Sequence, residues 1–533
     1  MRILTLLLAA APLFADPVIS ARKGNQLTIR FDNGDLEIEF VTPSVFRVRR
    51  GLAGPPKRPL AEKAVDIKTS VSKQGLRLET NEFFLDVTPN GLLRVSLPAL
   101  ELYREESVSM ADGKAEIQVH AAASERFYGL GPRPQDALDA RGLVLQPATP
   151  FYISGRGYAL WMATPTPFRF DVAKTNSQRL SITTSGVERV EYYFDYGPSL
   201  KEMWDGKLRA SGAVEVPGSE IAFISGPRVP RGVTSLKEAS LCGDARALVH
   251  ATLSGLPIPA IDLSNYRTAD DVTFRRAARL AAFAPAARDS AGMPFEGAKE
   301  TMAQETRNFR KRLLHFLITY TDETRARGYP IIHPLLHQFP RDPIAGQHID
   351  EYMFGDEFLV IPVCESAALK NVYLPMGNWT DWNTHKQYKG RQNADVPVPA
   401  DGLIVLVKNG SIVPLAGLQP GEPTELHYFP TNGGEFFLLE PDIAEWTQAH
   451  AGPAADIYRV EVESKVSRRY EWVVYQMNKP RQVVQVDGGA FAEAAQVGPL
   501  APRQWRYNAA ARTVRIGIDA AAGSDVIVNL LFQ

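Results

Sequence analysis

Histidine, cysteine and acidic residues are the side chains in this sequence best suited to binding metals or transferring protons. The nine histidines are scattered without HExxH spacing, and the two cysteines, Cys242 and Cys364, do not form a CxxC pair. Because protein metal sites usually show such spacings, the sequence predicts neither a metal site nor a cofactor. Two cysteines exclude a disulfide framework but permit one disulfide bond.

One aspartate and one acidic stretch stand out because each directly precedes an apolar segment. Asp244 precedes the apolar segment 245–253, where its carboxylate suits the N-cap of a helix. The stretch 347–363 contains four acidic residues in its polar part and then an apolar run at 358–363. A short apolar run after a polar turn is typical of a buried strand.

The overall composition narrows the classes of partner. The chain has 533 residues, a net charge of -1 and 45% hydrophobic residues. This length allows roughly three or four domains of ~150 residues. The near-neutral charge gives no electrostatic reason to expect nucleic acid or an anionic membrane as a partner.

The N-terminus has the pattern of a secretory signal peptide. Arg2 precedes an apolar run at 3–14, and Ala15 offers a small residue for cleavage. A buried first strand is the alternative interpretation. The run is shorter than the ~20 residues that a transmembrane helix needs. We therefore expect residues 1–15 to be removed and the mature protein, starting near Asp16, to be secreted or periplasmic.

Residues 16–196 alternate apolar and polar side chains, as strands do. Two such runs flank Asn33-Gly34, and two more flank Pro89-Asn90-Gly91. Asn-Gly between alternating runs is a strong hairpin signal, because both turn positions need positive φ. The segment is therefore predicted to be an antiparallel β-sandwich.

The pattern changes to mixed helix and strand over 197–366. Helices are predicted at 201–209, 270–283 and 300–327, the last one ending at Gly328. Short apolar runs at 281–284 and 358–363 separate helical segments, which favours an α/β unit. Strand patterns then return, predicting two C-terminal β-sandwiches at 367–423 and 424–533.

Several motifs together resemble glycoside hydrolase family 31, the family of α-glucosidases and α-xylosidases. They occur in family order along most of the chain, at 125–131, 150–158, 192–199, 253–262, 283–288, 310–340, 352–356 and 372–379. The resemblance implies a multidomain fold: a galactose-mutarotase-like N-terminal β-sandwich, a TIM-barrel-like α/β segment and two C-terminal β-sandwiches.

The barrel segment departs from this resemblance. Only 45 residues separate Ser199 from Asp244, and 197–366 holds 170 residues, against ~250 for an eight-stranded barrel. We therefore expect a truncated barrel that lacks about five strands and their helices. The family's nucleophile motif, of Trp-x-Asp-Met-Asn-Glu type, is not found. Trp204-Asp205 and Trp379-Thr380-Asp381-Trp382 are spaced differently.

The resemblance implies site residues that act on α-linked sugars by a retaining mechanism, which needs a nucleophile and an acid/base ~5–5.5 Å apart. Asp244 resembles the acid/base, although Ala245 stands where the family has Asn. Asp262 and Arg288 resemble sugar-binding residues, although Ser290 stands where the family has His. The structural alternatives are a helix N-cap for Asp244 and a salt bridge for Arg288.

Three hypotheses remain open. In the first, the protein is a hydrolase of α-O-glycosyl bonds with a rearranged site, in which Asp262 or Glu296 partners Asp244. In the second, it is a non-catalytic pseudoenzyme that binds carbohydrate or a protein partner, with Trp161, Trp379 or Trp382 stacking on sugar rings.

In the third hypothesis, the chain is a deletion product or an incorrectly assembled reading frame. In every case an incomplete barrel leaves strand edges to be covered. A second copy of the chain could cover them, which makes a homo-oligomer one expectation.

Overall fold

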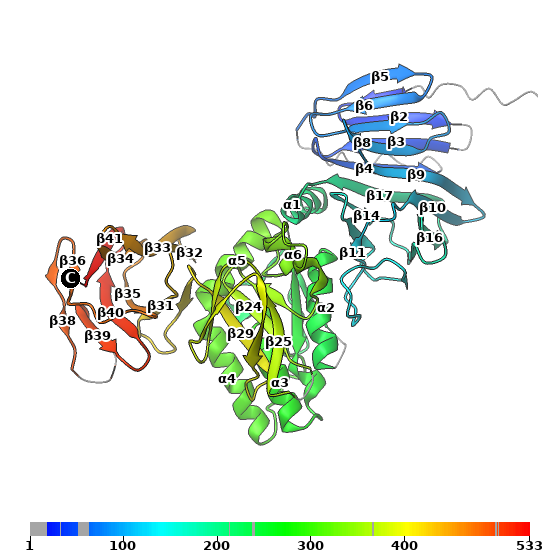
Figure 1. The fold of residues 1–533 in the computed structure, drawn as a ribbon. Coiled ribbons are helices and arrows are strands. Elements are labelled where there is room, and N and C mark those ends of the chain that lie inside the picture. Colours follow the sequence, from blue (N-terminus) through cyan, green and yellow to red (C-terminus); the bar gives the residue numbers. More distant parts are fainter. Residues whose placement is uncertain are drawn as a thin grey trace, which may run out of the picture. The chain divides into compact units, whose positions relative to one another are not determined.

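The computed structural model describes residues 19–31, 34–51, 63–212, 214–236, 240–364, 367–495, 498 and 500–532. The chain divides into two units (Figure 1). The first unit contains the residues up to Leu130 and Asp139–Gly212; the second contains Gly131–Leu138 and the residues from 213 onward. Residues 1–18, on which the signal-peptide prediction rests, lie outside the described residues.

Two antiparallel sheets form the first unit. One has the order β1 (Ile19–Lys23), β2 (Gln26–Phe31), β3 (Gly34–Phe40), β4 (Val45–Gly51), β17 (Arg189–Tyr196), β14 (Tyr158–Met162), β13 (Phe151–Ser154), β11 (Phe127–Gly129). The other has the order β12 (Val144–Leu145), β15 (Arg169–Val172), β16 (Arg179–Ser185), β10 (Lys114–His120), β9 (Leu100–Ala111), β8 (Leu93–Leu97), β7 (Phe84–Val87), β6 (Gly75–Glu79), β5 (Lys68–Ser72).

Alternating burial explains how these strands make a sandwich. Ile29 pairs with Leu36 across β2 and β3 and both are buried, while their sequence neighbours are more exposed. Side chains from both sheets, Ile29 and Leu85 among them, share one hydrophobic core. The paired strands around 32–33 and 88–92 confirm the alternating runs as strands, and Gly91 has the expected positive φ of 78°.

Helix α1 (Leu200–Ser211) closes the first unit and packs on β17. Glu202 accepts a hydrogen bond from the Ser199 N–H at 2.7 Å, one half of a capping box. Gly206 faces Asp195, and a Cβ there would lie 2.2 Å from a carboxylate oxygen. The glycine therefore allows the helix to approach a buried carboxylate closely.

A four-stranded parallel sheet lies in the second unit. Its order is β18 (Ile224–Ser225), β21 (Ala286–Asp289), β20 (Ile258–Asp262), β19 (Val233–Ser235). The first and last strands in sequence are thus neighbours, and residues 226–232 join β18 to β19 at the opposite edge. The sequence predicted a barrel remnant that lacks about five of eight strands and so keeps about three. The described residues contain four parallel strands. The sequence pattern underestimated this number, because β18 and β19 are too short to give a periodic signal.

Six α-helices and three 3-10 turns accompany the strands in the described residues. Besides α1, they are η1 (Ser219–Ala222), α2 (Leu241–Leu253), η2 (Leu263–Tyr266), α3 (Asp271–Ala282), α4 (Ala298–Arg312), α5 (Leu314–Arg327), α6 (Leu335–Gln338) and η3 (Ala345–Gln347). Helices α2 and α3 pack on β20, and α4 packs on α3. None of the helices in the described residues has the length and apolarity that crossing a bilayer requires.

Two local predictions differ from the structure. The apolar run 281–284 is not a strand, because Ala281 and Ala282 complete the buried face of α3 and β21 begins only at Ala286. The helix predicted at 300–327 is two helices, interrupted at Leu313. Gly328 does end α5, with the left-handed φ of 74° that favours glycine there.

Arg310 of α4 is a buried anchor between these helices and the sheet. Its side chain is fully buried, and its guanidinium donates to six backbone carbonyl oxygens, those of Ile221, Ala222, Ala281, Ala282, Ala284 and Pro285. These carbonyls belong to η1, the end of α3 and the entry to β21. One side chain thus fastens three segments to one another.

The run at 358–363 forms a strand, but not within the parallel sheet. It becomes β24 of an antiparallel sheet with the order β22 (Ile332–Pro334), β23 (Tyr352–Phe354), β24 (Phe358–Pro362), β29 (Leu403–Lys408), β26 (Asn378–Asp381), β27 (Gln387–Lys389). Beside it lie β25 (Leu369–Leu374) and β28 (Gln392–Pro397). A fully buried apolar strand has the same sequence pattern in a parallel and in an antiparallel sheet, so periodicity could not tell which sheet this strand joins.

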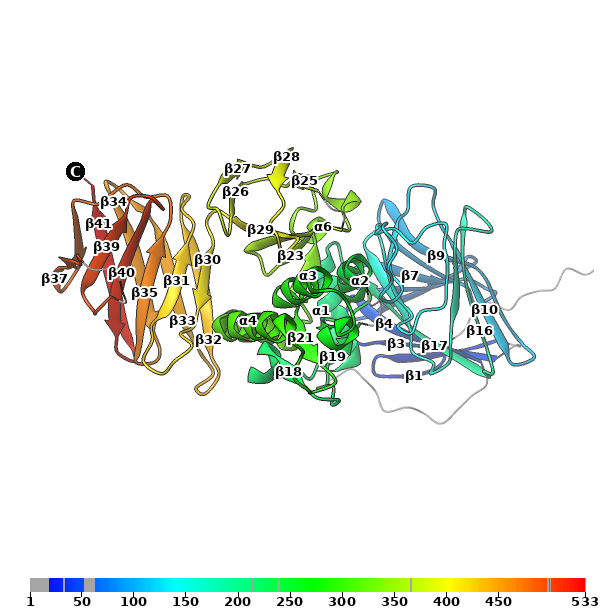
Figure 2. The ribbon, with the colours of Figure 1, turned by 90° about the horizontal axis from the view of Figure 1, so that it is seen from below.

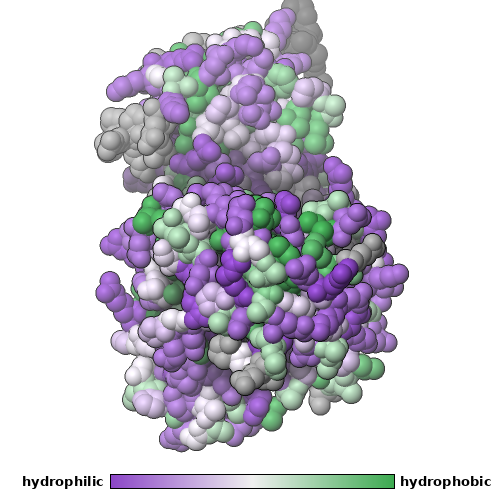
Figure 3. Space-filling view, turned by 90° about the vertical axis from the view of Figure 1, so that its left-hand side faces the viewer, coloured by the Kyte–Doolittle hydropathy of each residue, from purple (hydrophilic) through white to green (hydrophobic). Residues whose placement is uncertain are grey.

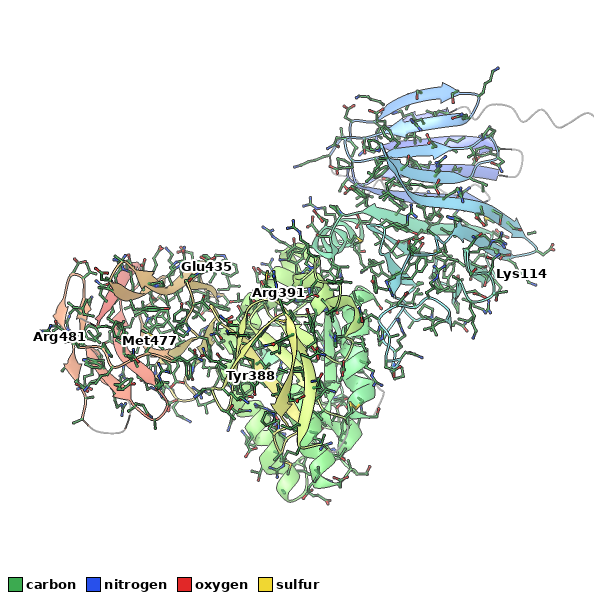
Figure 4. The ribbon with its side chains drawn as sticks, viewed as in Figure 1. Lys114, Tyr388, Arg391, Glu435, Met477 and Arg481 are labelled. Carbon is green, nitrogen blue, oxygen red and sulfur yellow. A yellow bond between two sulfur atoms is a disulfide. The ribbon has the colours of Figure 1, made fainter. Side chains whose placement is uncertain are left out.

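Two six-stranded sheets complete the C-terminal part. One has the order β30 (Ile412–Leu415), β31 (Thr424–Tyr428), β35 (Arg468–Val474), β40 (Thr513–Ala520), β39 (Gln504–Asn508), β38 (Ala492–Glu493). The other has the order β32 (Gly434–Glu440), β33 (Glu445–Ala454), β34 (Ile457–Ser464), β41 (Ser524–Leu531), β36 (Gln482–Gln485), β37 (Gly489–Ala490). Figure 2 shows β31, β35 and β40 running side by side. Tyr388 lies in β27, whereas Glu435, Met477 and Arg481 lie in the C-terminal part (Figure 4).

Candidate functional site

The carboxyl ends of the four parallel strands bring polar residues to one edge of the sheet. Ser235 ends β19, Asp262 ends β20, and Arg288-Asp289 ends β21. In parallel α/β sheets, ligands bind outside this edge. The structure therefore brings together Asp262 and Arg288, two of the three predicted site residues.

Asp262 is 5% exposed, and its carboxylate is held by the surrounding backbone. Oδ1 accepts hydrogen bonds from the Ser264 N–H at 3.0 Å and the Ser290 N–H at 3.1 Å. Oδ2 lies 3.4 Å from Nε of Arg288. Ser290, which stands where the family has a histidine, thus contributes its backbone to the Asp262 site.

Arg288 is 2% exposed and spans the sheet. Besides its ion pair with Asp262, it donates to the Ser235 hydroxyl at 3.4 Å and to the Gly226 carbonyl at 3.0 Å. The guanidinium thus joins the ends of β18, β19 and β20. These contacts favour the salt-bridge alternative, in which Arg288 positions strand ends.

Asp289 is a third polar residue at this edge, and the sequence interpretation missed it. Its carboxylate accepts from the Ser264 hydroxyl at 2.6 Å and from Arg267 Nη2 at 3.1 Å. Arg267 in turn lies over the ring of Phe295, 4.1 Å from its centroid. The charged pair Arg288-Asp289 after an apolar strand was the available signal, because polar residues at strand ends often line sites.

Asp244 lies in the first turn of α2 and is 1% exposed. The N-cap alternative is wrong, because Ser240 caps the helix by accepting from the Gly243 N–H at 3.2 Å. Asp244 Oδ2 instead accepts from the Tyr266 hydroxyl at 2.5 Å. Burial and the Asp244 carboxylate both raise the pKa of Tyr266, so this hydroxyl keeps its proton and donates it.

Tyr266 connects Asp244 to the edge that carries Asp262. It ends η2, which directly follows β20. A helix that returns antiparallel between two parallel strands starts at their carboxyl edge, so the first turn of α2 lies on the same side. Glu296, the other suggested partner of Asp244, is exposed in the segment before α4.

Two further acidic residues considered as nucleophiles have local structural contacts. Asp205, on α1 of the first unit, pairs with Arg209 at 2.7 Å. Asp381 accepts from the backbone N–H groups of Asn383 and Thr384, which shapes the turn between β26 and β27. Neither lies on the parallel sheet.

The tryptophans proposed to stack on sugars are not exposed platforms. Trp161 is 7% exposed and Trp379 is fully buried, so both belong to cores. Trp382 is half-buried and packs against Phe358 and Phe429. The prediction of exposed aromatic platforms is therefore wrong for Trp161 and Trp379, because large aromatic side chains gain most free energy when buried.

Cys242 and Cys364 form a disulfide bond with a Cα–Cα distance of 5.8 Å. The bond fastens the first turn of α2, two residues before Asp244, to the segment after β24. It thus links the helix that carries the candidate acid/base to the antiparallel sheet. The sequence permitted this bond but did not predict it.

Within the described part of the chain, one group of side chains could offer ligands to a metal. Atoms of His348, Asp350 and Glu351 lie within 4.8 Å of one another. Their positions also have local explanations: Asp350 pairs with Lys370 at 3.1 Å, and Glu351 accepts from the Tyr373 N–H at 3.0 Å. The cluster therefore does not by itself point to a bound metal.

The fold and the edge define a multidomain, mostly β-sheet protein with a partial parallel α/β segment. Among known protein families, residues 328–413 match the one described as "Glycosyl hydrolase family 31 C-terminal domain". This range contains the antiparallel sheet with β24 and the motif at 352–356. The chain is thus similar to glycoside hydrolase family 31, as the sequence motifs indicated.

Curated relatives support the same resemblance. The chain is 27% identical over 161 residues to alpha-glucosidase 2 of Bacillus thermoamyloliquefaciens, covering 29% of this chain and 20% of the relative. It is 30% identical over 141 residues to an alpha-xylosidase of Saccharolobus solfataricus, covering 25% of this chain and 19% of the relative. The matches thus span about a fifth of each relative's length.

Solved structures extend the likeness of fold. A family 31 dextranase of Flavobacterium johnsoniae, complexed with isomaltotriose, aligns with a TM-score of 0.78 at 14% identity. That alignment covers 97% of this chain and 100% of the dextranase chain. At such identity the likeness concerns the fold alone, while the family resemblance suggests a glycoside hydrolase.

Proposed function

We propose that this protein recognises α-linked carbohydrate at the carboxyl edge of its parallel sheet and that its hydrolytic step is impaired. The observation that carries the proposal is the state of the edge carboxylates. Asp262 is paired with Arg288, Asp289 with Arg267, and all these side chains except Arg267 are almost fully buried.

Retaining hydrolysis needs two carboxylates that both reach the glycosidic bond. An Arg-paired, buried carboxylate is a poor nucleophile, because the ion pair already stabilises its negative charge. Asp244 alone could transfer a proton, but a lone acid forms no glycosyl-enzyme intermediate. These arguments support recognition over turnover.

The relatives guide the choice of sugar. They include an alpha-glucosidase, an alpha-xylosidase and a dextranase complexed with isomaltotriose. We therefore propose α-glucosides or α-xylosides as ligands. We also propose that the protein acts outside the cytoplasm, as the signal-peptide pattern predicts. The Cys242–Cys364 bond supports this, because such bonds persist in oxidising compartments.

The test measures turnover and binding on the same preparation. Aryl α-glucosides, α-xylosides and α-galactosides report turnover, and calorimetry with isomaltotriose and xylose reports binding. We expect heat of binding without release of the aryl group. Binding should weaken in Asp262→Asn and stay unchanged in Asp271→Asn, an exposed aspartate in the first turn of α3.

A second candidate function is residual α-glycosidase activity. It is favoured by one observation, the Tyr266 hydrogen bond that joins Asp244 to the end of β20. In that case the aryl glycosides are hydrolysed and Asp244→Asn abolishes the activity. Turnover that depends on Asp244 would therefore overturn the proposal of impaired hydrolysis, and absence of both turnover and binding would overturn both candidates.

A further inference from the structure

A concave site lies in the C-terminal part, on β31, β35 and β40. It is a groove of about 970 Å³, within the size range of ligand pockets. Its lining includes residues of the segment 417–423 and also His385 and Tyr475. The groove is built from residues far from Asp262 in the sequence.

Its floor is a network of paired charges. Glu425 of β31 pairs with both Arg312 and Arg515, and Arg515 also pairs with Glu471 of β35. Burial raises the pKa of Glu425, but His427 and the two arginines outweigh it and hold that pKa well below its usual range. The planar carboxylate and guanidinium groups are thus fixed before any ligand arrives.

The lining is close to neutral. It contains four arginines and three glutamates, which are Arg312, Arg469, Arg506, Arg515, Glu422, Glu425 and Glu471. Nucleic acids and polyanions need a clear excess of positive charge. Many donors and acceptors without net charge suit a ligand with many hydroxyl groups, because each hydroxyl both donates and accepts.

The lining also offers apolar surface between these polar groups. Leu418, in the segment 417–423, is 43% exposed. Tyr475 is only 7% exposed, and its ring packs on Phe429 at 4.5 Å and contacts His385 at 4.6 Å, so it supports the groove from beneath. An exposed aliphatic side chain such as Leu418 can contact the C–H face of a sugar ring, whose rim carries the hydroxyl groups. Figure 3 shows one face of the molecule, on which hydrophilic residues dominate and hydrophobic residues are scattered.

We propose that this groove binds a neutral oligosaccharide, independently of the edge of the parallel sheet. The assignment goes beyond the proposed function, because it places a sugar site in a part of the chain that holds none of the candidate catalytic residues. The groove would keep the protein on a polysaccharide while its other site samples chain ends.

The experiment is hydrogen exchange with and without isomaltotriose, combined with calorimetry. We expect protection of peptides covering 417–423 and 504–515. Ala511 lines the groove in the turn between β39 and β40. Ala511→Trp should fill the groove and weaken binding there by about tenfold or more, a loss of ~1.4 kcal/mol. Ala490→Trp, an exposed alanine on β37, is the matched control.

This experiment tests the proposed sugar site in the groove separately from the one at the sheet edge. Asp262→Asn should leave protection in the groove unchanged, even if binding at the sheet edge is absent. Unchanged exchange at both groove peptides, or full affinity at these peptides in Ala511→Trp, would overturn the assignment. Tighter binding of inorganic phosphate than of isomaltotriose at the same peptides would also overturn it, because the groove would then select anions.

Discussion

Arg310 should be among the most sensitive positions of the second unit. Replacing it with methionine keeps an unbranched side chain of similar length but removes the donors to six backbone carbonyls, at distances of 2.6–3.3 Å. Burial lowers the pKa of Arg310 to about 9, so the guanidinium is still charged at pH 7. Arg310→Met therefore removes a buried charge together with its hydrogen bonds.

The magnitude follows from two opposing effects. Each buried carbonyl left without a donor costs about 1–3 kcal/mol. Relief of the buried charge returns several kcal/mol, and water can satisfy some of the carbonyls. We expect a net loss of about 3–5 kcal/mol in the free energy of unfolding. The second unit comprises Gly131–Leu138 and the residues from 213 onward, and for a unit of this size the loss lowers the melting temperature by roughly 4–7 °C.

Calorimetry should show the shift in the transition of the second unit, and hydrogen exchange should localise it. Peptides covering η1 and 281–286 should lose protection first. Lys311→Met is the matched control, because Lys311 is the next residue of α4 and is exposed. A loss below about 1 kcal/mol for Arg310→Met, or equal effects of the two substitutions, would refute the anchoring role.

Three other perturbations test separate features. Burial raises the pKa of Asp195, so the folded state keeps a proton that the unfolded state releases above its pKa of 3.8. Its stability contribution therefore falls as pH rises above that value. Asp195→Asn should stabilise the first unit at pH 8 and have little effect at pH 4, and a pH-independent difference in melting temperature would contradict this. Cys242→Ser with Cys364→Ser removes a cross-link between residues 122 apart, and should cost about 4–5 kcal/mol in the chain-entropy account. Equal melting of the oxidised protein and this variant would count against it. At Gly355, with a φ of 59°, a Cβ would lie 2.5 Å from the Phe316 ring, so Gly355→Ala should cost about 2–4 kcal/mol in chemical denaturation. An unchanged denaturation midpoint would show that the surrounding rings can move aside.

Local periodicity predicted much of the fold. The hairpins around 32–33 and 88–92, helix α3 and the end of α5 at Gly328 follow from alternation, capping and glycine chemistry. These features depend on residues close in sequence, where propensity and burial act together. The motif at 352–356 also pointed to the family whose C-terminal domain residues 328–413 match.

The features that the sequence analysis did not predict depend on contacts between residues far apart in the sequence or on the backbone. Whether β24 pairs in a parallel or an antiparallel sheet depends on β29, about forty residues later, and not on its own apolar side chains. No glycine or proline marks the interruption at Leu313 between α4 and α5. The partners of Arg310 are backbone carbonyls, which no side-chain pattern reveals.

The candidate site was only partly predictable for the same reason. Asp262 and Arg288 could be found because family motifs carry them. Asp289 and Tyr266 belong to the same edge, yet their importance comes from contacts across η2 and α2. Whether Asp262 is available to a substrate depends on the position of a guanidinium, which composition and spacing do not fix.

The connection at residues 226–232 has a consequence for protein engineering. It leaves β18 at the carboxyl edge of the sheet and enters β19 at the amino edge, on the far side of β21 and β20. Three strand spacings amount to about 14 Å, which seven extended residues can span with slack. Two parallel strands that follow one another in the sequence are usually joined by a dozen or more residues including a helix. The link from β18 to β19 is shorter than that, and it stands where a complete barrel would have several strand–helix units. It is therefore a natural insertion point, where a donor set of βα units could be grafted to restore a closed barrel around the existing seam between β18 and β21.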